Sequence, residues 1–141
     1  MASIDDIFDF VADEIGVDRT TLNPSTDIND ELGVEGDDFS ELIERYSDRF
    51  QVDMNGYLWY FHHAEEGFNI GGLFFRPPYD RVARVPVTPE LLLEGANGGR
   101  WPLEYVGHKL PKKRWDLLVN QLLLVVIVLV AVLIGLREFD A

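Results

Sequence analysis

Residues 117–136 read LLVNQLLLVVIVLVAVLIGL, and this apolar segment sets the architecture of the chain. It contains no charged residue, and sixteen of its side chains are Leu, Ile or Val. Twenty helical residues rise about 30 Å, the thickness of the hydrocarbon core of a bilayer. Its two polar residues, Asn120 and Gln121, lie near one end and do not outweigh the roughly −5 to −10 kcal/mol that the apolar side chains contribute to insertion. We therefore predict a transmembrane helix over residues 117–136 and not a core helix, which would keep one polar face.

The charges on either side of this segment predict its orientation. Cations gather before it, whereas only Arg137 follows it, beside Glu138 and Asp140. By the positive-inside rule, the amino-terminal part then lies in the cytoplasm. Residues 101–116 are expected to form a basic juxtamembrane linker whose headgroup-level residues are Lys109, Lys112, Lys113, Arg114 and Trp115. A short tail of residues 137–141 completes the sequence, so we expect a tail anchor that inserts after synthesis.

The rest of the chain is strongly acidic. The 141 residues include 25 Asp and Glu against 12 Lys and Arg, which gives a net charge of −13. Most of the excess lies in residues 1–66, which hold 18 acidic and 3 basic residues. Such a surface repels phosphate, so we expect no nucleic-acid partner. The absence of Cys excludes disulfides and thiolate chemistry, and the length allows one small domain with an appendage but not a two-domain enzyme.

Apolar residues recur at helical spacing within residues 1–100. A first helix is capped by Ser3 and stopped by Gly16, with an apolar stripe of Ile4, Ile7, Phe8, Val11 and Ile15. A second helix, over residues 37–50, has a stripe of Phe39, Leu42, Ile43, Tyr46 and Phe50. A third begins after Thr88-Pro89 and ends at Gly98-Gly99. We predict a mainly α fold for residues 1–100, a small helical bundle.

An aromatic-rich segment, about residues 55–87, is inserted between the second and third helices. We predict a short helix over residues 57–63 and two short strands, residues 69–75 and 81–87, that pair with each other. Most of the aromatic side chains are expected to complete the core, and the others to line a groove or approach lipid. His62 and His63 are expected to be partly exposed beside these aromatic residues.

One stretch carries a resemblance to a known family. Residues 32–42 read LGVEGDDFSEL, and residues 50–54 read FQVDM. They resemble the heart of acyl carrier proteins, where a pattern of the form L-G-x-D-S-L-D-x-x-E-L opens the second helix. Residues 88–92 resemble the start of the last carrier helix, so the resemblance covers residues 3–97. Among carrier-like sequences, the chain is most similar to the bacterial domain-of-unknown-function family 1493, including residues 74–78 and 99–101.

The resemblance also shows a departure from the carrier pattern. The carrier serine, which accepts the phosphopantetheine arm, aligns with Gly36, and glycine has no side chain to which an arm can be attached. Ser40 lies one helical turn further along, on a similar face of the second helix. Modification of Ser40 remains an alternative, although a transferase would have to reach into a helix.

The resemblance also implies that a second property of carriers, docking through an acidic second helix, is retained. Five acidic residues crowd the start and the exposed face of this helix: Glu35, Asp37, Asp38, Glu41 and Glu44. The resemblance implies that they bind a basic protein partner, because such charges steer encounters and select partners. Acids in the first turn also complement the helix dipole, which explains Asp37 and Asp38 without a partner.

The sequence offers no constellation for catalysis. Residues 27–38 superficially resemble a calcium loop, but Leu32 stands where the sharp turn requires Gly. We expect no catalytic residue, no metal site and no cofactor, and a transmembrane helix that contacts the lipid bilayer. The predicted function is a non-catalytic adaptor of the bacterial inner membrane that recruits a basic protein. Two alternatives stay open: a carrier protein modified at Ser40 or another serine, and an acidic inhibitor or immunity-type protein.

Overall fold

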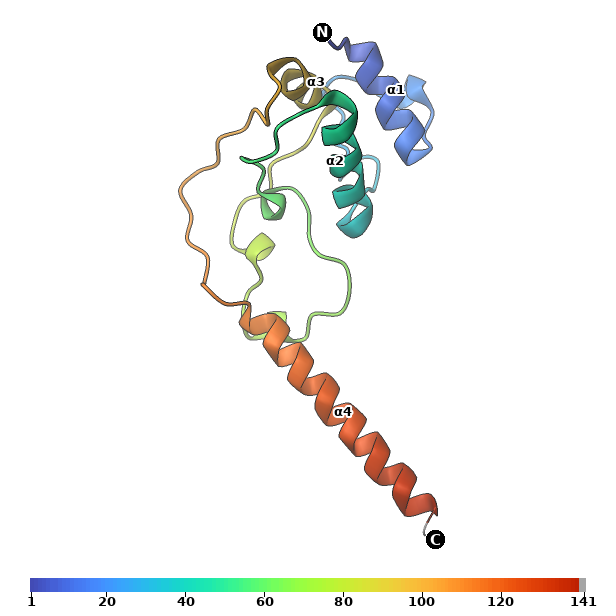
Figure 1. Cartoon of the computed structure of the whole chain (residues 1–141), viewed down its shortest axis with the longest axis vertical. Helices are drawn as coiled ribbons and strands as arrows, with labels where there is room; N and C mark the ends of the chain where they lie inside the picture. Colours follow the sequence, from blue (N-terminus) through green and yellow to red (C-terminus); the bar gives the residue numbers. More distant parts are fainter. Residues whose placement is uncertain (140–141) are drawn as a thin grey trace. The chain divides into compact units, whose positions relative to one another are not determined.

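The structure, a computed structural model, describes residues 1–139 and is mainly helical (Figure 1). It divides into two compact units, each of which is described by itself. The first unit comprises Met1–Glu66 and Val82–His108, and the second comprises Gly67–Arg81 and Lys109–Ala141. Of the predicted insertion, about residues 55–87, the part Gly67–Arg81 groups with the terminal helix in the structure. Residues 140 and 141 of the predicted tail lie outside the described residues.

The three predicted helices of the first unit are present, and local signals fix their ends. Helix α1 (Ile4–Ile15) begins at a capping box in which Ser3 and Asp6 bond each other's backbone N–H groups. Helix α2 (Gly36–Phe50) ends at Gln51, whose φ of 53° is left-handed. Helix α3 (Pro89–Gly98) begins at Thr88, whose side chain accepts the N–H of Leu91, and stops at Gly99. The predicted mainly α bundle is therefore confirmed.

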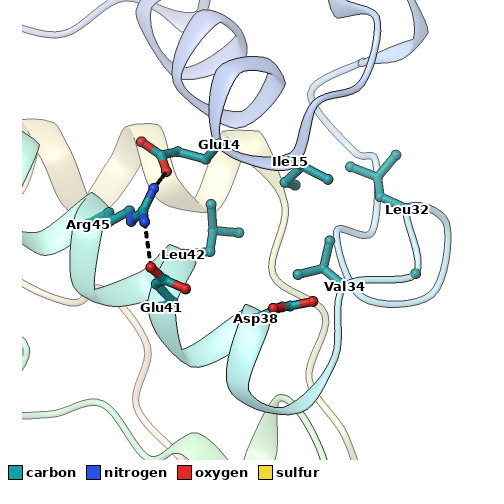
Figure 2. Close-up of a pocket in the computed structure, with 9 residues that line it drawn as sticks. Glu14, Ile15, Leu32, Val34, Asp38, Glu41, Leu42 and Arg45 are labelled. Atoms are coloured by element: carbon teal, nitrogen blue, oxygen red, sulfur yellow. Dashed lines mark hydrogen bonds and ion pairs between the residues drawn. The ribbon is translucent and has the colours of Figure 1, made fainter.

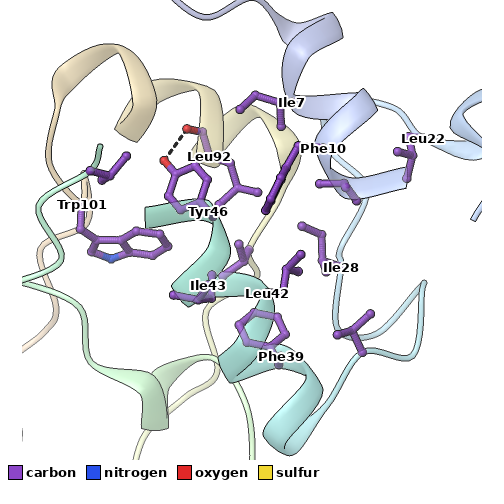
Figure 3. Packing of buried hydrophobic residues seen from close by; sticks show 14 residues of the cluster. Ile7, Phe10, Leu22, Ile28, Phe39, Leu42, Ile43, Tyr46, Leu92 and Trp101 are labelled. Atoms are coloured by element: carbon purple, nitrogen blue, oxygen red, sulfur yellow. Dashed lines mark hydrogen bonds between the residues drawn. The ribbon is translucent and has the colours of Figure 1, made fainter. Parts of the chain in front are cut away.

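The core lies between these three helices (Figure 3). The predicted stripe of α2 is buried from Phe39 to Tyr46. In α1 the sequence analysis missed Phe10, which is fully buried, whereas Phe8 is only half-buried. The Tyr46 hydroxyl donates to the carbonyl of Leu92 in α3 at 2.6 Å, which joins α2 to α3 through the centre of the core (Figure 3).

The predicted strands are wrong. Among residues 1–139 the structure has no strand, and its β pairing is limited to an isolated bridge between Asp53 and Arg100. Residues 69–75 instead contain the 3₁₀ helix η3 (Gly71–Leu73), because the side-chain oxygen of Asn69 accepts the N–H of Gly72 at 2.8 Å and bends the chain. Pro78 has no N–H for a ladder and begins the 3₁₀ helix η4 (Pro78–Asp80).

The segment predicted as a short helix over residues 57–63 forms only the 3₁₀ helix η2 (Trp59–Phe61). The expectation that His62 and His63 are partly exposed is wrong, since both are buried. The ring of His62 stacks on Tyr57, with centroids 5.1 Å apart, and its edge meets Trp101. Trp101 is itself part of the buried core, so the first unit continues beyond α3.

The second unit is built on helix α4 (Trp115–Phe139). Its residues Trp115–Arg137 form a helix long and apolar enough to cross a membrane, and no residue of its most apolar window is buried. The predicted apolar helix over residues 117–136 is therefore present. Within the same unit, η3 packs against the first turns of α4.

Candidate functional site

Helix α2 turns one face to the core and carries four of the predicted acidic residues on the other, while the fifth, Glu35, precedes its first residue. All five of them are exposed: Glu35, Asp37, Asp38, Glu41 and Glu44. Arg45 binds Glu41 one turn earlier in α2 and Glu14 of α1, whose carboxylate lies 2.5 Å from Nη1. In the part of the chain that the structure describes, Glu35, Asp37, Asp38 and Glu44 make no ion pair. Their charge is therefore available to another molecule.

A surface pocket of about 290 Å³ opens beside this acidic face, between the end of α1, residues 32–34 and α2 (Figure 2). Its apolar lining comes from Ile15, Leu32, Val34 and Leu42, and its charged lining comes from Glu14, Asp38, Glu41 and Arg45. Figure 2 shows that the two ion pairs of Arg45 lie along one side of the pocket. A lining that combines four apolar side chains with three carboxylates and one guanidinium suits a side chain that is itself amphipathic, such as Lys or Arg.

Gly36, where the carrier resemblance places the modified serine, is the first residue of α2. Its φ of 53° is left-handed, which residues with a side chain adopt at a cost. A Cβ built on Gly36 would lie 1.9 Å from Cγ of Glu66, so that side chain covers the position. The backbone conformation and the neighbouring Glu66 both favour glycine here.

Ser40 lies one turn further along α2, and the structure brings a histidine to it. The Ser40 hydroxyl donates to the carbonyl of Gly36 at 3.1 Å and lies 3.4 Å from Nε2 of His63. Nδ1 of His63 is 3.0 Å from the carbonyl of Ala64, so Nδ1 carries the proton and Nε2 is the acceptor. A second pocket, of about 260 Å³, borders this pair. Sequence analysis missed the pairing because 23 residues separate Ser40 from His63 and no motif links them.

The predicted headgroup-level residues belong to the second unit, where four of them precede α4 and Trp115 is its first residue. Lys109, Lys112 and Lys113 are exposed, and Nζ of Lys113 lies 5.6 Å from the centre of the exposed Trp115 ring. Arg114 is instead bound to Asp116 in the first turn of α4, with Nη2 2.6 Å from Oδ2. The three Lys side chains are thus accessible to anions, whereas Arg114 forms an intramolecular ion pair with Asp116.

A family model described as "Protein of unknown function (DUF1493)" matches residues 1–104. No curated protein and no solved structure matches the chain. The matched range contains α1, α2 and α3 and stops before α4.

Proposed function

We propose that this chain, which belongs to the DUF1493 family, is a membrane-anchored, non-catalytic adaptor with an acyl-carrier-like domain. In this proposal, α4 crosses the inner membrane of a bacterium. The first unit then lies in the cytoplasm and holds a basic protein partner at the membrane surface. The partner docks on the exposed acidic face of α2.

The observation that carries this proposal is that four acidic side chains at the start and on the outer face of α2 are exposed and lack a described ion pair. Glu35, Asp37, Asp38 and Glu44 are exposed, and no described ion pair uses them, while the opposite face of the same helix fills the core. The dipole of α2 accounts for Asp37 and Asp38 in its first turn. It does not account for Glu44, which lies beyond that turn, and the mutual repulsion among the four charges opposes the compact state. A cationic partner surface would remove that repulsion and gain attraction at the same time.

The pocket beside the acidic face supports a protein partner over a simple cation. Four apolar side chains line it, together with Asp38, which makes no described ion pair. A Lys or Arg side chain that enters it would place its methylene groups against apolar residues such as Leu42 and Ile15 and its charge near Asp38. A protein surface offers such side chains in a fixed arrangement.

The anchoring part of the proposal is supported by the composition of α4 and its flanks. The helix is long and apolar enough to cross a membrane. Three exposed Lys residues precede it, and among its last described side chains only Arg137 is basic. This asymmetry favours an orientation with the first unit on the cytoplasmic side.

Site-specific crosslinking in membranes tests the docking face. The full chain is expressed with the photoreactive residue p-benzoylphenylalanine in place of Asp38 and, as a matched exposed site on α3, in place of Glu94. Each of these two photoreactive chains is also prepared with three acidic residues replaced by their neutral amides. Two such sets of three substitutions are used, and both remove the same amount of charge. The test set is Asp37→Asn, Glu35→Gln and Glu44→Gln, and the control set is Asp13→Asn, Glu90→Gln and Glu104→Gln.

We expect an adduct with one basic protein from position 38 and none from position 94. The test set should reduce that adduct by about fivefold or more, because each lost charge pair contributes about 0.3–1 kcal/mol, whereas the control set should leave it unchanged. Equal reduction by both sets would contradict a specific docking face and leave only general electrostatic attraction. An adduct whose partner is an enzyme that loses activity on binding would favour the inhibitor alternative.

A second candidate function, a carrier modified at Ser40, is favoured by one observation. Nε2 of His63, which carries no proton, lies 3.4 Å from the Ser40 hydroxyl, so rotation of that hydroxyl away from the Gly36 carbonyl would give the arrangement of a base beside a nucleophile. The intact mass of the full chain after co-expression with a phosphopantetheinyl transferase tests it. An added arm that disappears in Ser40→Ala would establish the carrier function and reject the non-catalytic adaptor, whereas an unchanged mass would reject the carrier.

A further inference from the structure

The second unit carries an exposed apolar loop in addition to α4. Residues 68–75, called here the apolar loop, read FNIGGLFF. Phe68, Leu73 and Phe74 expose 93%, 83% and 73% of their surface, and Ile70 and Phe75 are also exposed. Five large apolar side chains on eight residues form a patch that water does not favour, so another apolar phase is expected to cover it.

The apolar loop is fastened to the start of α4 by a network of polar groups. The N–H of Gly71 donates to Oδ1 of Asn120 at 2.8 Å, and the Asn120 amide donates back to Oδ1 of Asn69 at 2.9 Å. The Asn69 amide in turn donates to the Asp116 carboxylate at 3.0 Å. These bonds hold the loop beside the first two turns of α4, and they give the polar Asn120 side chain its partners within an apolar helix.

Two further features make the contact close. A Cβ on Gly71 would lie 2.0 Å from the backbone oxygen of Asp116, so the loop approaches α4 to a distance that only glycine permits. The ring of Phe75 lies 6.4 Å from that of Trp115, centroid to centroid. The loop and the start of α4 therefore form one surface, and the two share a position relative to any membrane that α4 enters.

The second part of the apolar loop, residues 71–75, has backbone N–H groups that are already suited to an apolar medium. The N–H groups of residues 71–75 all have partners: Gly71 and Gly72 bond to the side chains of Asn120 and Asn69, and the next three bond to carbonyls of the η3 turn. A non-helical segment reaches membrane depth only when its backbone polar groups are satisfied. Two exposed cations, Arg76 and Arg81, follow the loop in the sequence.

We propose that the apolar loop inserts into the lipid bilayer at the boundary between headgroups and acyl chains, as a second membrane contact beside α4. The inference rests on the membrane anchor of the proposed function. Asn120 lies five residues into α4 from Trp115, which corresponds to about 7.5 Å along the helix axis. With Trp115 at the headgroups, the loop bound to Asn120 lies at the depth of about 5–10 Å that interfacial segments reach.

Depth-dependent fluorescence quenching in vesicles tests this proposal. The chain contains no Cys, so single Cys variants carry one label each without removal of native residues. The fluorophore NBD is attached to Leu73→Cys or Phe74→Cys in the loop, to Leu129→Cys in the middle of α4, and to the exposed Glu94→Cys in α3. The full chain is reconstituted in phosphatidylethanolamine and phosphatidylglycerol with lipids that carry a nitroxide at a shallow or a deep position of the acyl chain.

We expect shallow nitroxides to quench the labels at 73 and 74 at least about twofold more than the label at 94, and deep nitroxides to quench the label at 129 most. Quenching at 129 with none at 73 and 74 would overturn the loop proposal and leave the anchor intact. No quenching at 129 would overturn the anchor, and the loop proposal with it. Self-quenching between labels at 74 that disappears on dilution with unlabelled chain would place a second copy on the loop and also overturn the proposal.

Discussion

The hydroxyl of Tyr105 lies 2.6 Å from Nε2 of the buried His62. Nδ1 of His62 donates to the carbonyl of Val85 at 2.8 Å, so Nε2 carries no proton and accepts a hydrogen bond from the Tyr105 hydroxyl. The Tyr105 oxygen accepts in turn from the Trp101 indole at 2.8 Å and from the N–H of Leu58 at 3.3 Å. This network joins the segment after α3 to the aromatic insertion through a neutral imidazole.

Stability is expected to fall in mild acid because of His62. Burial lowers the pKa of His62 to about 4, from its ordinary value of 6.5, with a smaller opposing effect of the Val85 carbonyl. The unfolded chain therefore binds a proton at a higher pH than the folded chain. The stability that depends on a neutral His62 is fully present above about pH 6.5 and is lost towards pH 4, by about 3 kcal/mol in all.

Urea unfolding of the full chain in detergent at several pH values in this window measures the effect. Acidic residues titrate in the same window, so His62→Gln serves as the comparison: it should be less stable at neutral pH and show a flatter pH dependence. Identical slopes for the natural chain and His62→Gln would show that the histidine does not titrate between the two states.

The contact between Tyr46 and Gly95 predicts a pair of coupled mutations. A Cβ on Gly95 would lie 2.5 Å from the Tyr46 hydroxyl, so Gly95→Ala should destabilise the fold by about 1–3 kcal/mol. Tyr46→Phe removes that oxygen and its bond to Leu92, at a cost of about 1 kcal/mol. The double variant should lose less stability than the sum of the two. Gly98→Ala, in the same helix with open space around it, should be neutral or slightly stabilising; strict additivity would contradict the contact.

The left-handed backbone of Gly36 predicts an order among substitutions. Glu66 is exposed and can turn away, so the cost of a side chain at position 36 comes mainly from its φ of 53°. Gly36→Ala should cost about 1–2 kcal/mol of unfolding free energy, and Gly36→Asn should cost less because Asn tolerates this conformation. Gly56→Ala, which meets nothing within 4 Å, is the control. A larger cost for Asn than for Ala would show that the space beside Glu66 decides instead.

Gly71→Ala is expected to release the apolar loop from α4. The new Cβ would meet the backbone oxygen of Asp116, which cannot turn aside as a side chain can. Hydrogen exchange of the amides of residues 71–75, measured by mass spectrometry in nanodiscs, should accelerate by about tenfold or more. Gly107→Ala, at a position with open space, should leave the exchange of these amides unchanged. An unaltered rate in Gly71→Ala would mean that the loop is not held by this contact.

The acidic part of the candidate site could be predicted from the sequence because it depends on a single helix. The acidic residues of α2 share a face at helical spacing, and their exposure follows once the apolar stripe from Phe39 to Tyr46 is assigned to the core. The pairs of Arg45 with Glu14, and of Ser40 with His63, were not accessible. They join residues 31 and 23 positions apart, which no local pattern connects.

Residue order alone was enough for features that depend on a few neighbouring residues. The caps at Ser3 and Thr88 and the apolar run that forms α4 need only adjacent hydrogen-bonding groups or a summed apolar composition. The strand predicted over residues 69–75 failed because the N–H of Gly72 bonds to the nearby Asn69 side chain and the N–H of Gly71 bonds to Asn120, 49 positions away, so neither is offered to the strand predicted over residues 81–87. Folding in three dimensions selects such partners, since a polar group gains a hydrogen bond from whichever chain segment packing brings beside it.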